Sequence, residues 1–335
     1  MLGNLEMLRR KVATGLLCAL SMLPATAPAA EKVTYNMAWL PQGSVGGTIV
    51  AKAKGFFTEE GLDVELTRGY GGQRTVNEVD QGLFDIGYGD PPSVILNNAN
   101  GGRTVLVGAI NTRWPAGLCF VEDGKRHPKT PAELKGMTVA GGAGSPVQNI
   151  VPAWLKMNNL PPDSIKLLRM EPAVINSALI EGRVDLAECW EGANMPLLDF
   201  TAAQASKKVN HVLYRDFGLH IYGNGFVTSQ KMMKERPEVL RKFLRASYKG
   251  YRYMATNPDD SANAIAGLYP TLNKGVLTGQ IKQTADLLSD PGQPDQQMGF
   301  LRDDRMANTF KFTTEAFGVG DKLNVKQLYS NEFLK

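Results

Sequence analysis

The stretch VTYNMAWLPQGSVGGTIVAKAKGFFTEEGLDVEL at residues 33–66 decides the fold. It opens with a strand pattern at 33–38, passes through a helix of small residues at about 45–54, and ends in a second strand at 63–67. Gly55 suits the position just after the helix, where a positive φ favours glycine. A unit of about 35 residues with this order predicts two parallel strands joined by a right-handed crossover.

The loop at residues 39–44 follows the first of these strands. Ligands of open parallel sheets bind beyond the carboxyl ends of the strands, so this loop is placed where a ligand would lie. It supplies the flat Trp39 ring, the Gln42 amide and the first N–H groups of a helix. Beyond it, helix and strand patterns alternate to about residue 217, and mainly helical patterns follow a last strand at 226–228.

An internal echo indicates two similar lobes. Residues 80–86 read DQGLFDI and residues 180–186 read IEGRVDL, so each segment ends a helix at a glycine and restarts a strand at an aspartate. The distance between them is too long for a stacked repeat, but it suits two lobes of one design.

Four segments resemble periplasmic solute-binding proteins of ABC importers, above all the nitrate/sulfonate/taurine-type binders and their relatives that bind the thiamine pyrimidine precursor. The segments are KGFFTEEGLDVEL at 54–66, QGLFDIGYGDPPSVI at 81–95, LKGMTVA at 134–140 and LIEGRVDLAECWEG at 179–192, and the resemblance covers roughly residues 33–255.

This resemblance implies a two-lobed α/β fold of type II, in which each lobe is a doubly wound sheet flanked by helices and the ligand cleft lies between the lobes. We place lobe 1 at residues 31–115 plus 222–335 and lobe 2 at 116–221. The two chain crossings, near Ala116 and Leu219, are expected to form the hinge.

The amino-terminal residues have the pattern of a secretory signal. Arg9, Arg10 and Lys11 precede an apolar run at 12–23 that is short for a membrane span, and an A-x-A site follows. We therefore expect a signal peptide at residues 1–29, cleavage after Ala29 or Ala30, and a periplasmic protein; an uncleaved anchor is the alternative. The net charge of +4 gives no reason to expect nucleic-acid or membrane-surface binding.

Cysteine and histidine usage indicates neither catalysis nor a metal. Cys119 and Cys189 lie in apolar strand-like runs, so we expect small buried side chains, although an oxidising compartment permits a bridge. The three histidines are not spaced with cysteines or carboxylates as metal ligands, and no G-x-S-x-G motif is present. We expect no catalytic residue, no metal and no cofactor.

The candidate ligand contacts are groups that follow predicted strands. They are Trp39, Gln42, Asp90, Trp114, Gly142, Gly144, Ser145, Glu171, Glu188, Trp190 and Asn224. Core packing is the alternative for the tryptophans, and helix capping is the alternative for Asp90. Family members that bind sulfonate or nitrate carry a small polar residue near position 90, so Asp90 favours an amine or a heterocyclic N–H donor over a simple anion.

The implied function is the capture of a small organic solute, either sulfonate- or taurine-like or a pyrimidine or related small aromatic compound. A monomer would close on it and deliver it to a membrane permease that works with an ATPase subunit. The alternatives are an enzyme of pyrimidine metabolism on the same scaffold and a binding protein that feeds a sensor receptor. The related enzymes carry a Cys-rich motif, whereas residues 222–226 here read YGNGF.

Overall fold

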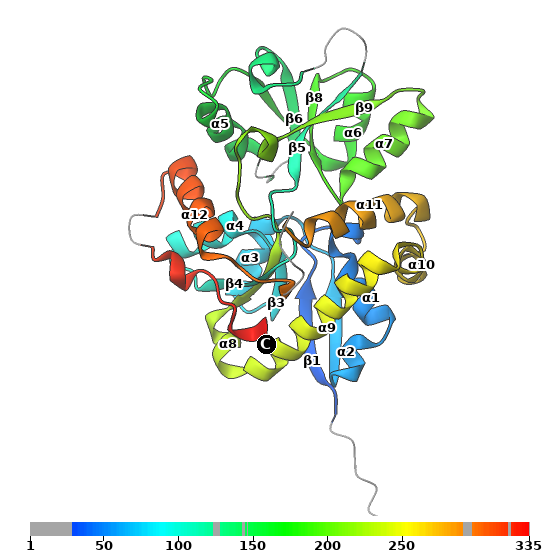
Figure 1. The fold of residues 1–335 in the computed structure, drawn as a ribbon, viewed down its shortest axis with the longest axis vertical. Helices are drawn as coiled ribbons and strands as arrows, with labels where there is room; N and C mark the ends of the chain where they lie inside the picture. Colours follow the sequence, from blue (N-terminus) through cyan, green and yellow to red (C-terminus); the bar gives the residue numbers. More distant parts are fainter. Residues whose placement is uncertain are drawn as a thin grey trace, which may run out of the picture.

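The computed structural model describes residues 29–122, 128–142, 145, 147–290, 297–320 and 323–334. Two five-stranded mixed sheets form two lobes, one above the other in Figure 1. The lower lobe contains the sheet β2-β1-β3-β10-β4, and the upper lobe contains the sheet β7-β6-β8-β5-β9. The predicted two-lobed α/β fold is confirmed.

The strands of the two sheets have these bounds. The first sheet consists of β1 (Glu31–Asn36), β2 (Leu62–Thr67), β3 (Ile86–Gly89), β4 (Thr104–Ala109) and β10 (Gly225–Ser229). The second consists of β5 (Ala116–Val121), β6 (Thr138–Gly142), β7 (Lys166–Met170), β8 (Leu186–Trp190) and β9 (Val209–Leu213). In each sheet the fourth strand runs antiparallel to both of its neighbours, while the first three strands are parallel.

Helices cover both sheets and extend into a carboxyl-terminal group. The chain forms α1 (Gly46–Ala53), α2 (Phe56–Glu59), α3 (Gly72–Asp80), α4 (Pro91–Ala99), α5 (Val147–Met157), α6 (Pro172–Ile180) and α7 (Asn194–Gln204). It continues with α8 (Gln230–Glu235), α9 (Pro237–Thr256), α10 (Pro258–Leu268), α11 (Lys274–Leu287) and α12 (Asp303–Phe317). Short 3-10 turns include η1 (Gly43–Val45) and η3 (Tyr214–Phe217). No helix within these described ranges is long and apolar enough to span a membrane.

The opening unit of the sequence folds as predicted, with β1 and β2 parallel and Gly55 at φ 77° after α1. The small residues of α1 serve close packing against the long helix α9. A Cβ added at Gly250 would lie 2.0 Å from the Gly47 carbonyl oxygen, so the two backbones touch at this point. Tyr251 then reaches past α1 and donates its hydroxyl hydrogen to the Ser44 carbonyl, which fixes the loop after β1.

Each lobe has the same set of aspartate–threonine hydrogen bonds, here called the clasp. It lies at the start of the strand that is third in the sheet order, which is β3 in the lower lobe and β8 in the upper lobe. Asp85 Oδ2 accepts from Thr34 N–H at 2.9 Å, and Asp185 Oδ2 accepts from Thr138 N–H at 2.8 Å. In both lobes the aspartate N–H donates back to the threonine Oγ1 at 3.0 Å. These aspartates are the ones that the internal echo aligns.

Two carboxyl-terminal helices lie against both lobes, on opposite flanks of the molecule in Figure 1. Helix α11 contacts η1 and α9 of the lower lobe and α7 of the upper lobe. Helix α12 contacts α4 and α5, and its Phe312 and Phe317 pack against the core of the upper lobe. Residues 303–317, which we assigned to lobe 1 from the sequence, therefore contact both lobes.

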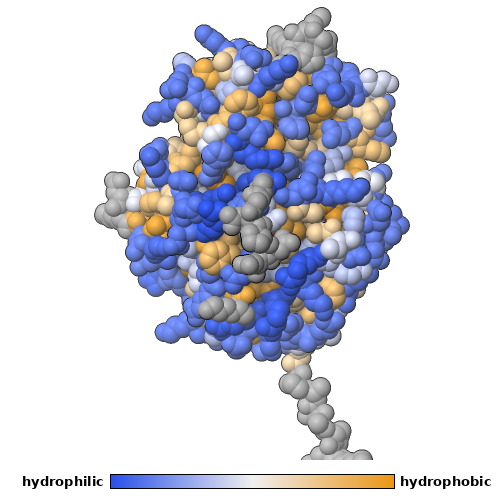
Figure 2. Space-filling model, viewed as in Figure 1, coloured by the Kyte–Doolittle hydropathy of each residue, from blue (hydrophilic) through white to orange (hydrophobic). Residues whose placement is uncertain are grey.

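The outer surface in the view of Figure 2 is mostly hydrophilic. Figure 2 shows hydrophilic side chains over most of the viewed face, interrupted by smaller apolar patches. The apolar side chains concentrate instead in separate cores on the faces of the two sheets. Strand β4 is buried along its whole length, which is typical of a strand covered on both faces.

Candidate functional site

The carboxyl ends of the parallel strands in both lobes point toward the junction between the lobes. Strands β1, β2 and β3 run upward from the free end of the lower lobe (Figure 1). In the upper lobe, the turn after β8 contacts α11 of the lower lobe through a Gly192 N–H to Gln283 Oε1 hydrogen bond of 2.8 Å. The loops after these strands therefore lie at the junction between the lobes, where the strand-end rule places a ligand.

The lower lobe has a group of neutral polar side chains near these strand ends. Tyr88, in β3, is 6% exposed, and its hydroxyl accepts from Asn111 Nδ2 at 3.3 Å. Ser44, in the loop after β1, accepts a hydrogen bond from Gln42 Nε2 at 3.0 Å. Burial raises the pKa of Tyr88, and hydrogen bonds with Asn111 and Ser44 partly offset this rise. The phenol is therefore a neutral donor and acceptor at neutral pH.

The upper lobe contributes a partly buried carboxylate. Glu188, in β8, accepts from the Gly142 N–H at 2.9 Å and from the Ser145 hydroxyl. Burial raises the pKa of Glu188, while these two hydrogen bonds act in the opposite direction. Three predicted site residues thus meet at one point, where a ligand N–H group would find an acceptor.

The two polar pairs occupy equivalent places in the two lobes. Tyr88 follows the Asp85 clasp by three positions, and Glu188 follows the Asp185 clasp by the same number. Ser44 and Ser145 each lie in the loop after the strand that pairs with this one. These are two half-sites, Tyr88 with Ser44 and Glu188 with Ser145, which have equivalent positions in the two lobes and different chemistry.

Three buried polar atoms near these half-sites have no hydrogen-bond partner within the part of the chain that the structure describes. They are Asn111 Oδ1, Trp114 Nε1 and the Tyr214 hydroxyl, on side chains that are each 1% exposed. The charge of Glu188 contributes to the raised pKa of Tyr214, after the larger effect of burial. An unpaired buried polar atom costs about 1–3 kcal/mol, so these atoms favour a bound molecule that pairs with them.

The tryptophans predicted to contact ligand divide into exposed and buried ones. Trp39 is 36% exposed, so it is not a core residue. Trp114 is buried, and its ring centroid lies 5.4 Å from that of the partly buried Trp190. Core packing therefore accounts for the Trp114 ring, and its indole N–H is left without a hydrogen-bond partner among the described residues. The fourth tryptophan, Trp154, is fully buried.

The remaining predicted residues have different settings. Asp90 is buried as the N-cap of α4, where it accepts from the Ser93 N–H at 2.8 Å and from the Ser93 hydroxyl at 2.9 Å. Burial raises its pKa, and the Ser93 hydrogen bonds partly offset this. Glu171 is exposed before α6, and Asn224 accepts from the Asn111 N–H at 2.8 Å through its carbonyl. Gly144 lies outside the described residues.

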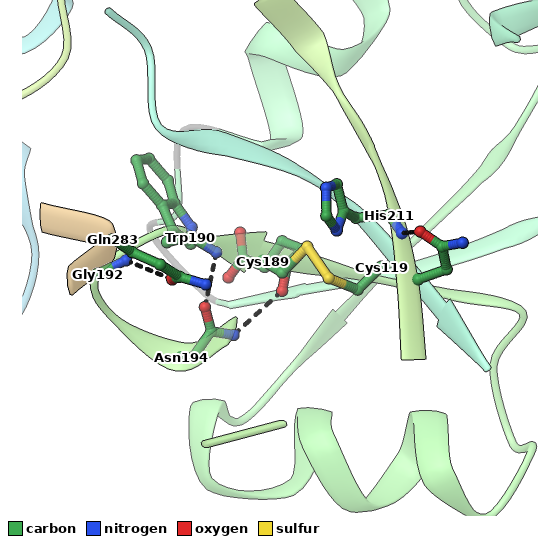
Figure 3. Close-up of a disulfide and its surroundings, with 9 residues drawn as sticks. Cys119, Cys189, Trp190, Gly192, Asn194, His211 and Gln283 are labelled. Atoms are coloured by element: carbon green, nitrogen blue, oxygen red, sulfur yellow. Dashed lines mark hydrogen bonds between the residues drawn. A yellow bond between two sulfur atoms is a disulfide. The ribbon is translucent and has the colours of Figure 1, made fainter. Parts of the chain in front are cut away.

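The expectation that Cys119 and Cys189 are separate buried side chains is wrong, because they form a disulfide (Figure 3). The bridge joins β5 to β8 next to Glu188, diagonally across the antiparallel pair. Asn194 supports the same strand end: it accepts from the Trp190 N–H at 2.8 Å and donates to the Glu188 carbonyl at 3.2 Å. The apolar runs predicted the burial of the two cysteines but did not show that their strands pair.

The described residues contain no group of three or more His, Cys, Asp or Glu side chains that could hold a metal ion. A cavity of about 520 Å³ does lie elsewhere, lined by the outer end of β5 and the start of β9, with Glu122 and His211 among its residues. It lies at the opposite end of the upper sheet from the carboxyl end of β8, so the junction between the lobes remains the better candidate site.

The raised pKa of Glu188 gives a testable pH dependence. Between the unfolded pKa, about 4.3, and its raised folded value, the folded state binds more protons at this group than the unfolded state. Its contribution to the unfolding free energy therefore falls as pH rises through that window. We expect Glu188→Gln, which keeps an acceptor for Gly142 N–H, to gain stability over the parent as pH rises from 4.5 to 7.

Urea unfolding at several pH values measures this difference. Glu65→Gln, on the exposed edge of β2, is the matched control for the removal of one carboxylate. A stability difference for Glu188→Gln that stays constant with pH would contradict the burial of a titrating carboxylate.

Comparison with known proteins supports the predicted resemblance. A family model described as NMT1/THI5 like matches residues 42–261. The chain is 26% identical over 241 residues to the formylaminopyrimidine-binding protein of Halalkalibacterium halodurans, covering 71% of this chain and 70% of that one. It is 22% identical over 262 residues to the 4-amino-5-hydroxymethyl-2-methylpyrimidine phosphate synthase of Saccharomyces cerevisiae, covering 76% of each.

A solved structure shows the same fold. The periplasmic aliphatic sulphonate binding protein SsuA of Escherichia coli superimposes with a TM-score of 0.66 at 19% identity, covering 90% of this chain and 92% of that one. Relatives of this fold thus include binding proteins and an enzyme. The family match extends from the loop after β1 into α10 and includes both half-sites. The chain therefore belongs to the NMT1/THI5-like family.

Proposed function

We propose that this protein is the substrate-binding component of an ABC uptake transporter. It captures a small organic solute in the interlobe cleft and delivers it to a membrane permease. The observation that supports the proposal is that two equivalent polar half-sites lie near strand ends that face the lobe junction, with three buried polar atoms near them that lack described partners. A ligand held between the lobes forms hydrogen bonds with polar groups of both lobes at once.

Hinge closure is the proposed mechanism. The two segments that cross between the lobes are hydrogen-bonded to each other: Asn111 N–H donates to the Asn224 carbonyl at 2.8 Å, and Gly223 N–H donates to the Asn111 carbonyl at 3.0 Å. The crossings can therefore bend as one unit. A ligand that pairs with groups of both lobes binds the closed form more tightly than the open form, and this difference in affinity shifts the population toward closure.

The chemistry of the half-sites favours a nitrogen heterocycle over a simple anion. Glu188 reaches the cleft as an acceptor, and Asp90 lies buried at the end of β3. A sulfonate next to these carboxyl groups would meet like charge, whereas a heterocyclic N–H or amino group would donate to Glu188. The Trp39 ring adds a flat face for such a ring to stack on.

We propose that this protein functions in the periplasm and that the signal sequence at residues 1–29 directs its export. A receptor that senses the loaded form is the alternative partner to a permease. The mechanism needs no turnover, so we propose that the ligand leaves unchanged. The alternative function is catalysis on the same scaffold. The yeast synthase that this chain resembles is the reason to test for it directly.

Native mass spectrometry of gently purified protein tests this proposal. We expect a co-purified molecule that contains a nitrogen heterocycle, and a chain that begins at Ala30 or Glu31 because the leader has been removed. After long incubation with that molecule, chromatography should recover it unaltered. A product that accumulates in proportion to protein concentration would move the protein to the enzyme class, and a tightly held aliphatic sulfonate would overturn the ligand class.

A further inference from the structure

Helix α11 places an amide side chain between the two lobes. Gln280 is 6% exposed, and its Oε1 accepts from the Gly43 N–H of the lower lobe at 2.9 Å. Its Nε2 donates to the Ala193 carbonyl of the upper lobe at 2.6 Å. One carboxamide thus joins the loop after β1 to the turn after β8, and both segments border the cleft.

A second glutamine and two glycines complete this contact. Gln283, one turn further along α11, accepts from the Gly192 N–H at 2.8 Å (Figure 3). A Cβ at Gly43 would lie 2.4 Å from Gln280 Cβ, and a Cβ at Gly192 would lie 2.2 Å from Thr284 Oγ1. Gly192 also has φ 69°, which favours glycine. Because Gly43 and Gly192 have no side chain, the backbone of each lobe can lie directly against α11.

The turn that α11 holds is the one that carries the upper half-site. Asn194 follows Ala193 directly and is hydrogen-bonded to the backbone of Glu188 and Trp190. The glutamines fix residues 192 and 193, and Asn194 fixes the strand end before them. Gly43, which follows Gln42, is thus linked to Glu188 through Gln280, the adjacent residues 193 and 194, and their hydrogen bonds.

We infer that Gln280 is a positioning residue of the ligand site, which fixes the two half-sites relative to each other in the arrangement that the structure shows. This inference rests on the proposed function in treating the interlobe cleft as the ligand site. The contact itself needs no ligand, because both of its hydrogen bonds join protein groups. Without it, the ligand-free lobes should separate further on average.

The test uses two substitutions that differ in which bond they remove. Gln280→Glu keeps an acceptor for Gly43 N–H but replaces the donor to Ala193 with an oxygen, so the link to the upper lobe alone is lost. Gln280→Met has similar length and loses both bonds. Lys282→Ala, an exposed change on the same helix, is the matched control. Melting curves establish that each variant is folded.

The measurement is the distance between spin labels on Asp63→Cys in β2 and Lys166→Cys in β7, both exposed positions, in ligand-free protein. We expect both Gln280 variants to show a distribution displaced by more than about 2 Å, the scale of domain rearrangement, while Lys282→Ala matches the parent. A Gln280→Glu distribution equal to that of the parent would overturn the inference. That outcome would leave the proposed function standing, because no ligand takes part in the measurement.

Discussion

Reduction of the Cys119–Cys189 disulfide is expected to lower the unfolding free energy of the protein by about 4 kcal/mol. The bridge closes a chain segment with a sequence separation of 70 residues, and a cross-link of this span removes much of the conformational freedom of the unfolded chain. It also holds β8, which carries Glu188, against β5. The effect is therefore larger than that of any single surface substitution.

Urea unfolding of oxidised and reduced parent protein measures this effect without any change of core volume. Cys119→Ala with Cys189→Ala gives a second estimate, which includes the loss of two buried sulfur atoms. A difference below about 1 kcal/mol between oxidised and reduced protein would show that the bridge restricts the unfolded chain far less than its span implies.

Replacement of Trp39 by alanine is expected to weaken ligand binding roughly thirtyfold, since truncating a buried aromatic anchor typically costs about 2 kcal/mol or more. The backbone beside the ring is already fixed. Ala38 has φ 59°, its N–H donates to Asn36 Oδ1 at 2.8 Å, and its carbonyl accepts from the Gly71 N–H at 2.7 Å. The exposed indole is thus attached to a rigid loop, so stacking of a ligand on it loses little conformational entropy.

Calorimetric titration with the identified ligand, together with melts of the ligand-free protein, measures this effect. Because Trp39 is exposed in the ligand-free chain, its loss should leave the apo melting temperature near that of the parent. Leu40→Ala, an exposed apolar neighbour at 46%, is the matched control and should retain affinity. Affinity within threefold of the parent for Trp39→Ala would exclude the ring from the ligand contact.

The elements that the sequence predicts well depend on short-range signals. Gly55, Gly82 and Gly182 all have positive φ where helices end, and Asp90 caps α4 with Pro91 after it, as the pattern indicates. The echo between 80–86 and 180–186 corresponds to real structural equivalence, because the two aspartates form the same clasp. These features are encoded within a few residues and need no knowledge of the tertiary fold.

The features that the sequence does not predict are long-range contacts between unremarkable residues. Gly43 and Gln280 are separated by 237 positions, and no local pattern distinguishes Gln280 from other polar residues of a surface helix. Asn111 and Tyr214 likewise carry no motif, and their importance arises only when the chain crossings bring them near the half-sites. The disulfide was missed for the same reason, since strand pairing decides whether two buried cysteines meet.

The clasps and the half-site side chains lie at separate positions along the same two strands. Asp85 and Asp185 secure the starts of β3 and β8, while Tyr88 and Glu188 present the recognising groups three positions later. A substitution at position 88 or 188 therefore leaves the clasp of its strand untouched. Such a scaffold can acquire a new ligand by drift at one position in one lobe while the other lobe keeps its contacts. For engineering, a small library at these two positions is the natural starting point for altered selectivity.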